Sequence, residues 1–156
     1  MTESVCAALR LDEEILDSET GSISCEFRSR SDGNLFALRG GDGIGLELRI
    51  VGSSLVYEAT VPGRWSKLEA EDVRSLDDGR WHSAVVTVGS AGTRLYLDGY
   101  QVFCGTTTTF LKDLPGLTQA VVGQGDSPEV TAFTVHPRVL TSREVLALSK
   151  RAEPLV

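Results

Sequence analysis

The sequence lacks the features that mark membrane-associated and nucleic-acid-binding proteins. None of its 156 residues belongs to an apolar run long enough to span a membrane. Lysine and arginine are few, 15 against 22 acidic residues, and the net charge of -7 disfavours binding to phosphate backbones or anionic lipid surfaces. We therefore expect neither nucleic acid nor a membrane among its partners.

The first residues, Met1 to Cys6, also lack the basic start and apolar run of a signal peptide. Two interpretations follow, a cytoplasmic protein or an excised module of a secreted protein whose leader was removed. The oligomeric state stays open.

Cysteine is scarce, and its count is odd. The three residues are Cys6, Cys25 and Cys104, which fit poorly with a framework of paired disulfides. Free cysteine behaves as a small hydrophobic residue, and cytosolic chains keep it reduced. We interpret the three as buried or half-buried thiols, with a Cys25–Cys104 bridge as the alternative.

Recognisable catalytic and metal-binding patterns are missing as well. The only two histidines, His82 and His136, lie in different predicted strands, and no nucleophile or third ligand accompanies them at a recognisable spacing. The acidic runs at residues 12–14 and 69–72 do not supply the two carboxylates that flank the bond in a glycosidase, nor an EF-hand. We predict no catalytic residue, no metal site and no cofactor.

What the sequence does contain is a series of short alternating segments separated by Gly, Asp, Ser and Pro. Ile23, Cys25 and Phe27, for example, alternate with polar residues, as in a strand with one buried face. Such segments at this spacing indicate an all-β sandwich or barrel. The expected strands are 23–28, 34–39, 46–50, 55–61, 81–88, 93–97, 100–104, 119–122 and 130–136.

The chain reads as a single domain spanning residues 1–156. Folding a chain of this length buries roughly 70% of the surface of the unfolded chain, which is enough for one core. No internal repeat or low-complexity linker marks a second domain.

One hairpin is predicted around Ser53-Ser54. A two-residue turn there pairs Arg49 with Glu58 and keeps polar residues opposite one another. The stretch that follows, residues 64–78, is acidic and irregular, and we predict a loop with one helical turn at most.

A second hairpin is predicted at Asp98-Gly99, a dipeptide that favours a tight turn. Pairing across this turn sets Leu95 opposite Val102 and Thr93 opposite Cys104. Near the end, residues 141–144 (TSRE) form a capping box before an apolar run, which predicts one short C-terminal helix.

Two of these segments carry a resemblance to a known family. Residues 78–85 (DGRWHSAV) and 93–99 (TRLYLDG) together resemble the DG-x-WH-x-V and LY-x-DG pattern of laminin G and concanavalin A-like lectin domains. The ending VHPRVLTSREV, residues 135–145, is similar to the last strand and helix of those domains. The resemblance implies a two-sheet antiparallel jelly-roll sandwich.

Within that superfamily, residues 20–28 and 109–114 are similar to the lectin-like module found beside bacterial sialidases. This resemblance implies that a polar sheet face or the rim loops bind sugar, with sialic acid as the first ligand to test. We expect a carbohydrate or another small molecule as the partner.

Polar residues on the predicted strands supply a candidate binding face. Arginine there can hold a sugar carboxylate through two parallel hydrogen bonds, and tyrosine can stack on a ring. An ordinary solvated face, with an ion pair between Arg49 and Glu58, is the alternative. The predicted ligand-binding residues are Arg28, Glu47, Arg49, Glu58, Arg94 and Tyr96.

The leading hypothesis is therefore a non-catalytic, carbohydrate-binding lectin-like domain. Two alternatives stay open. The sandwich cleft can bind or transform a metabolite in a free-standing intracellular protein such as a cyclase or isomerase, or the domain can recognise another protein through its rim loops.

Overall fold

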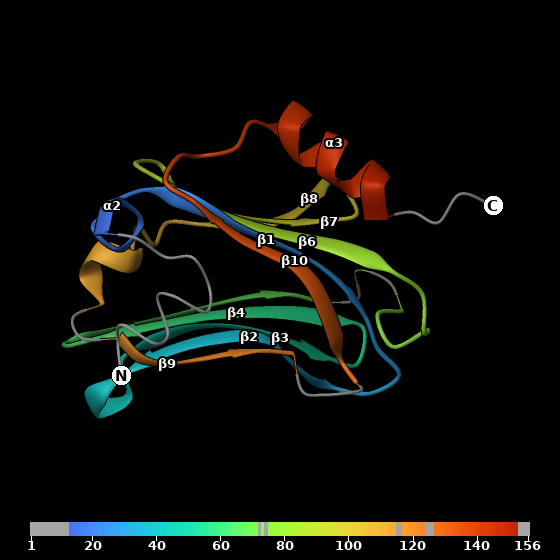
Figure 1. The fold of residues 1–156 in the computed structure, drawn as a ribbon, viewed down its shortest axis with the longest axis horizontal. Helices are drawn as coiled ribbons and strands as arrows, with labels where there is room; N and C mark the ends of the chain where they lie inside the picture. Colours follow the sequence, from blue (N-terminus) through green and yellow to red (C-terminus); the bar gives the residue numbers. More distant parts are fainter. Residues whose placement is uncertain (1–12, 72, 74, 115–116, 124–126, 153–156) are drawn as a thin grey trace.

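The alternating segments build two antiparallel sheets that face each other across one core (Figure 1). The computed structural model describes residues 13–71, 73, 75–114, 117–123 and 127–152. The predicted fold class, an all-β two-sheet antiparallel sandwich with a short C-terminal helix, is confirmed.

Each sheet has five strands. Sheet A contains, in spatial order, β10 (Glu129–His136), β1 (Gly21–Arg28), β6 (His82–Gly89), β7 (Gly92–Leu97) and β8 (Tyr100–Gly105). Sheet B contains β5 (Arg64–Ala70), β4 (Ser54–Val61), β3 (Gly45–Val51), β2 (Gly33–Gly40) and β9 (Leu117–Val122). The helical elements are α2 (Glu13–Leu16), η1 (Gly41–Gly43), η2 (Leu111–Asp113) and α3 (Ser142–Ala152).

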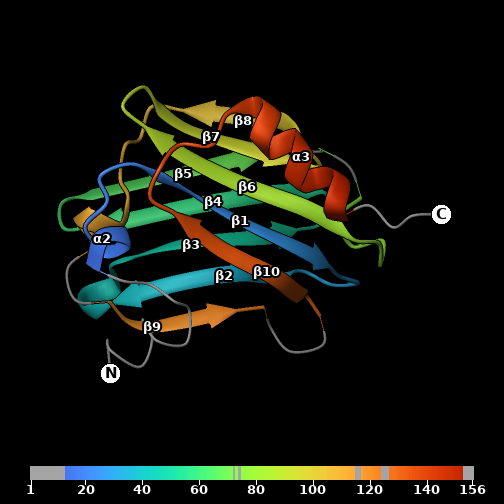
Figure 2. The same cartoon turned by 45° about the horizontal axis from the view of Figure 1, so that its top comes forward.

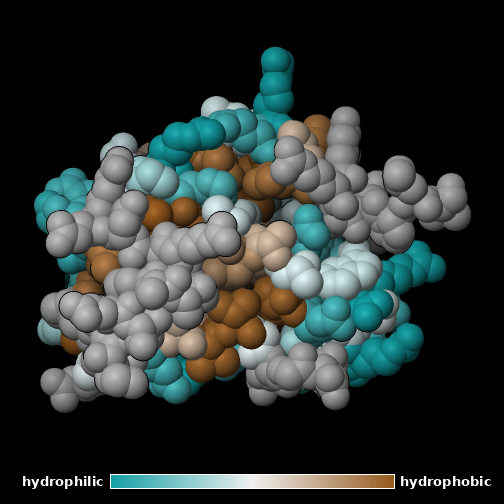
Figure 3. All heavy atoms as spheres, in the orientation of Figure 1, coloured by the Kyte–Doolittle hydropathy of each residue, from teal (hydrophilic) through white to brown (hydrophobic). Residues whose placement is uncertain are grey.

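The core lies between the sheets and is built from the inward residues of each strand. Phe27 from sheet A and Phe36, Leu48 and Tyr57 from sheet B are fully buried there. Phe133 of β10 packs edge-on against Phe36 with ring centroids 5.5 Å apart. In the space-filling view of Figure 3, apolar residues reach the surface between polar ones on this side of the sandwich.

The β3–β4 hairpin has a different register from the predicted one. Gly52, at φ 62°, takes the left-handed conformation that glycine adopts without steric cost, so the chain turns at Gly52-Ser53 and not one residue later. Arg49 consequently lies opposite Val56, and Glu47 lies opposite Glu58. The predicted pairing of Arg49 with Glu58 across the strands is wrong.

The β7–β8 hairpin turns at Asp98-Gly99 as predicted, with positive φ at both residues. Beyond the turn the register shifts by one residue at a β-bulge, where Val102 is the extra residue on β8. Leu95 therefore lies opposite Phe103 and not Val102, and Thr93 lies opposite Gly105 and not Cys104.

The stretch predicted to be a loop begins with a strand. β5 pairs along its whole length with β4 at the edge of sheet B. Leu68 and Ala70 point into the core, whereas the alternate residues face solvent and are polar or exposed. The prediction was wrong because a strand that is solvated on one face and at an edge needs few apolar residues.

Both cysteines in the described part of the chain are free, so the alternative of a Cys25–Cys104 bridge is wrong. Cys25 lies in the core, where burial, reinforced by the charge of Glu26, raises the pKa of its thiol to about 12. Cys104 is exposed on β8. Cys6 lies outside the described residues.

Helix α3 covers the outer face of sheet A, on the side away from sheet B (Figure 1). Val145 packs there with Val85, Tyr96 and Leu140 in a second, smaller apolar cluster. The predicted capping box is confirmed by its distances: the Glu144 amide donates to Thr141 Oγ1 at 3.2 Å, and the Thr141 amide donates to Glu144 Oε1 at 3.1 Å. None of the described helices is long and apolar enough to cross a membrane.

Candidate functional site

The outer face of sheet B carries a continuous group of charged and aromatic side chains. They come from the outward positions of four adjacent strands, because alternation sends every second residue of each strand away from the core. We call them the sheet B site, which consists of Arg39, Glu47, Arg49, Glu58 and Trp65.

Hydrogen bonds link the five side chains in a chain. Arg49 Nη1 donates to Glu58 Oε1 at 2.7 Å and lies 3.4 Å from Glu47 Oε1. Arg39 Nη2 reaches Glu47 Oε2 at 3.3 Å. At the other end, the indole Nε1 of Trp65 donates to Glu58 Oε2 at 2.6 Å. Each carboxylate thus has donors on both of its oxygens.

These contacts shift the pKa values of Glu58 and Arg49 in the directions that favour their charged forms. The indole N–H of Trp65, followed by the Arg49 guanidinium, lowers the pKa of the Glu58 carboxyl. The hydrogen bond with Glu58 in turn raises the pKa of Arg49. Because the pairs are partly exposed to water, each contributes only about 0–1 kcal/mol, so a ligand can replace one of them at little cost.

A shallow pocket of about 190 Å³ opens at one end of the sheet B site. Arg39, Glu47, Glu58 and Thr60 line it, together with the backbone of the glycine-rich segment 40–45 around η1. Trp65 lies opposite Thr60 in the strand register and is 62% exposed. The pocket therefore combines one cation, Arg39, with two carboxylates, and an aromatic ring lies beside it.

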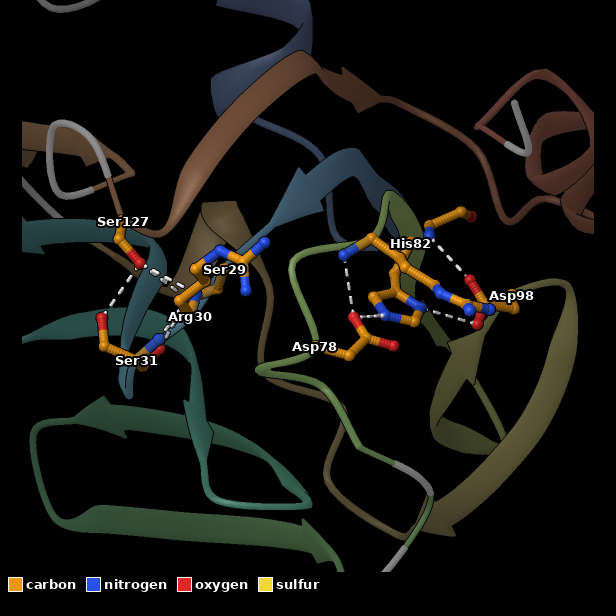
Figure 4. Close-up of polar contacts among 9 residues, drawn as sticks. Ser29, Arg30, Ser31, Asp78, His82, Asp98 and Ser127 are labelled. Carbon is orange, nitrogen blue, oxygen red and sulfur yellow. Dashed lines mark hydrogen bonds and ion pairs between the residues drawn. The ribbon is translucent and has the colours of Figure 1, made fainter. Parts of the chain in front are cut away.

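A second polar cluster, around His82, is buried (Figure 4). His82 Nδ1 lies 2.9 Å from Asp98 Oδ2, and Nε2 lies 2.9 Å from Asp78 Oδ1. Burial lowers the pKa of His82, but the hydrogen bonds that Asp98 and Asp78 accept, together with their negative charges, outweigh this effect and raise the pKa above its usual value. With 3% of its surface exposed, the His82 ring ties the loop before β6 to the β7–β8 turn.

A third polar cluster, also shown in Figure 4, joins two chain segments through serine hydroxyls. Ser127 Oγ lies 3.1 Å from Ser29 Oγ and 3.0 Å from Ser31 Oγ, and it accepts the Arg30 amide at 3.0 Å. These contacts fasten the β1–β2 connection to the segment before β10. In the described part of the chain, no group of three or more His, Cys, Asp or Glu side chains is placed to hold a metal ion.

Comparison with protein families assigns this fold. A model described as the concanavalin A-like lectin/glucanases superfamily matches residues 6–145. The chain belongs to this superfamily. No curated protein matches the sequence.

Several solved structures share the concanavalin A-like fold at low identity. The carbohydrate-binding module of the Ruminococcus gnavus sialidase bound to α2,3-sialyllactose matches with a TM-score of 0.73 and 14% identity over 86% of this chain and 85% of that chain. The same module bound to α2,6-sialyllactose matches with a TM-score of 0.70, 15% identity and the same two coverages.

A structure of botulinum neurotoxin type C, whose description names an interaction with two ganglioside molecules, matches with a TM-score of 0.66 and 16% identity. The match covers 92% of this chain but 39% of that chain. At these identities the likeness shows the fold alone.

Within the concanavalin A-like domain, the motif that carries the family resemblance has a structural role. Its residues Asp78, His82 and Asp98 form the buried cluster described above. The sheet B site lies outside that motif.

The structure brings together half of the predicted ligand-binding residues. Glu47, Arg49 and Glu58 share the sheet B site, where the expected ion pair between Arg49 and Glu58 forms diagonally across the strands. The prediction that all six share one face is wrong, because the strands of the concanavalin A-like domain divide between two sheets.

The other three predicted residues belong to sheet A. Arg28, at the end of β1, pairs with Glu129 at 3.1 Å and lies over the Trp81 ring, 5.0 Å from its centroid. Arg94 is exposed on the outer face of β7. Tyr96, its neighbour on that face, is 3% exposed because α3 packs over it.

Two residues of the sheet B site were missed in the sequence. Arg39 ends the mostly apolar strand predicted at residues 34–39, and alternation along β2 turns it outward beside Glu47. Trp65 was missed because residues 64–78 were predicted to be a loop. The signal that could have identified Trp65 is an aromatic residue at an outward position of a strand.

Proposed function

We propose that the sheet B site binds a glycan through a sugar that carries a carboxylate, with sialic acid as the first ligand to test. The observation that carries the proposal is the hydrogen-bonded chain from Arg39 to Trp65 beside a shallow pocket. The sialyllactose and ganglioside named for the structural neighbours support this choice of ligand.

Each member of the site has a role that suits its chemistry. Arg39 has one carboxylate contact, at 3.3 Å, and its guanidinium is partly exposed at the pocket, so its planar fork can accept a sugar carboxylate through two hydrogen bonds. Glu47 and Glu58 accept hydrogen bonds from sugar hydroxyl groups. Trp65 offers an exposed ring on which the apolar face of a sugar packs.

We propose that the domain binds this sugar without cleaving it. Glycosidases that use two carboxyl groups keep one of them protonated as a general acid, which requires a raised pKa. The Trp65 N–H and Arg49 lower the pKa of Glu58, so Glu58 stays ionised and is a poor proton donor. The metabolite-binding and protein-recognition alternatives remain predictions.

Titration calorimetry with a methyl sialoside tests the proposal. Arg39→Gln should weaken binding by about tenfold or more, because a charge-assisted bidentate contact contributes about 1.5–3 kcal/mol. Arg94→Gln is the matched control, since Arg94 is also an exposed arginine but lies on the outer face of sheet A. Its affinity should equal that of the unmodified protein.

A methyl galactoside, which lacks the carboxylate, should bind much more weakly than the sialoside. The absence of sialoside binding at millimolar concentration, or an equal loss in the Arg39→Gln and Arg94→Gln variants, would overturn the proposal.

A further inference from the structure

A larger hollow lies beside the sheet B site. It follows the side of the sandwich on which the edge strands β5 and β8 lie (Figure 2). We call it the edge cleft. It has a volume of about 720 Å³ and continues past the end of β8 along residues 106–109. At the bottom of the edge cleft lies the core residue Leu68, which packs beside Gly105.

Each of the two strands that line the edge cleft contributes an aromatic residue. Trp65 belongs to β5, and Phe103, 40% exposed, belongs to β8. Phe103 sits at an inward position, opposite Leu95, but β8 is the last strand of sheet A and no further strand covers the ring. Exposed apolar patches that are rimmed by polar residues mark ligand-binding grooves.

The two cations in the remaining lining each lie beside a carboxylate. Arg64 lies 3.9 Å from Asp113, and Lys67 pairs with Glu69 at 3.3 Å. The run of four threonines at 106–109 adds hydroxyl groups, of which those of Thr106 and Thr108 belong to exposed residues. Aromatic walls with neutral hydroxyl groups suit the apolar faces and hydroxyl edges of uncharged sugars.

The edge cleft lies next to the pocket of the sheet B site. Trp65 lines the cleft, and its indole N–H donates to Glu58, which lines the pocket. Thr60, also in the pocket lining, lies opposite Trp65 in the strand register. A ligand that leaves the pocket toward β5 therefore reaches the cleft without crossing another strand.

We propose that the edge cleft binds the neutral hexoses that follow the acidic sugar in the same glycan. This inference rests on the proposed function of the sheet B site. The domain then binds one oligosaccharide at two neighbouring places. The acidic sugar occupies the pocket, and the neutral sugars pack between Trp65 and Phe103.

Calorimetry with two ligands tests it, a methyl sialoside and the trisaccharide sialyllactose. The trisaccharide should bind more tightly, and Phe103→Ala should weaken it roughly three- to tenfold, the range expected for one aromatic contact. The same variant should leave the affinity for the methyl sialoside within about twofold. Tyr100→Ala is the matched control, because Tyr100 is an exposed aromatic on β8 that lines neither hollow.

The outcomes separate the two proposals. Equal affinities for both ligands, with no effect of Phe103→Ala, overturn the proposal for the edge cleft but not the proposal for the sheet B site. If neither ligand binds, both proposals are wrong.

Discussion

At the scale of single residues, Tyr57 has an unusual position in the core. Its side chain is fully buried on β4, and among the described residues its hydroxyl has no hydrogen-bond partner. Burial alone raises the pKa of that hydroxyl. A buried polar group without a partner costs about 1–3 kcal/mol of stability.

Tyr57→Phe should therefore raise the free energy of unfolding by about 1 kcal/mol. Urea denaturation measures this change. Tyr100→Phe is the control, because the exposed hydroxyl of Tyr100 is solvated in both states and its removal should have no measurable effect. A loss of stability in Tyr57→Phe would contradict the assignment of an unpartnered hydroxyl.

His82 shows how a buried charge links stability to pH. Asp98 and Asp78 raise its pKa in the folded protein despite the opposing effect of burial. A group whose pKa is raised by folding binds its proton more tightly in the folded state. Its contribution is therefore complete below the unfolded pKa of about 6.5 and is lost as the pH rises through the folded value.

We expect the contribution of His82 to the free energy of unfolding to decline as the pH rises from about 6.5 into the alkaline range. In His82→Gln that decline should disappear. His136→Gln should retain it, because burial, together with Arg138, lowers the pKa of His136, so its contribution is lost toward acid instead. Unfolding curves measured across this pH range test the difference, and an equal slope in all three proteins would refute it.

At the scale of elements, α3 depends on its first turn. Arg138, followed by the Thr141 amide, lowers the pKa of the Glu144 carboxyl to about 2, so the capping box keeps its charge over the whole working range of pH. The helix it starts covers Tyr96 and the rest of the outer cluster on sheet A.

Thr141→Ala removes the oxygen that caps the Glu144 amide and should lower the free energy of unfolding by about 1 kcal/mol. Ser142→Ala changes the neighbouring exposed residue and should shift stability by less than about 0.5 kcal/mol. Chemical denaturation compares the two variants. Equal effects would mean that the Thr141 hydroxyl does not act as a cap.

At the scale of the whole molecule, the outer faces of the two sheets differ in what lies on them. The outer face of sheet A is partly covered by α3, whereas the outer face of sheet B carries the charged network and its pocket. Side chains on opposite faces of a packed core share no contacts. Substitutions that change stability on one face and binding on the other should therefore be independent.

The double variant Thr141→Ala, Trp65→Ala checks this independence. Its affinity for sialyllactose should equal that of Trp65→Ala alone, and its loss of unfolding free energy should equal the sum of the two single losses within about 0.5 kcal/mol. Calorimetry and urea denaturation of the four proteins give both quantities. A larger coupling would show that α3 and the sheet B site communicate through the core.

Much of the fold was predictable because its signals are local. The Asp98-Gly99 turn, the capping box at Thr141 and the inward faces of most strands follow from a few neighbouring residues each. The errors arose where one residue shifted a register, at Gly52 and at the Val102 bulge. β5 was missed because its outward face needs no apolar residues.

The candidate site was only half predictable. Glu47, Arg49 and Glu58 were identified because they alternate with apolar residues on adjacent segments, and their nearness follows from one hairpin. Arg28, Arg94 and Tyr96 satisfied the same pattern but belong to the other sheet. Alternation shows that a side chain points outward, but it does not show from which sheet.

The sequence by itself determined the strand-rich class, the Asp98-Gly99 turn, the terminal helix and the membership in the superfamily, because these depend on sequence patterns. Only the tertiary structure decided which polar face forms the candidate site. That choice depends on the division of strands between two sheets and on α3, which packs over Tyr96. It also depends on the pairing of β5 with β4, which sets Trp65 beside Glu58. These contacts join residues through the assembled core and edges, so no local segment encodes them.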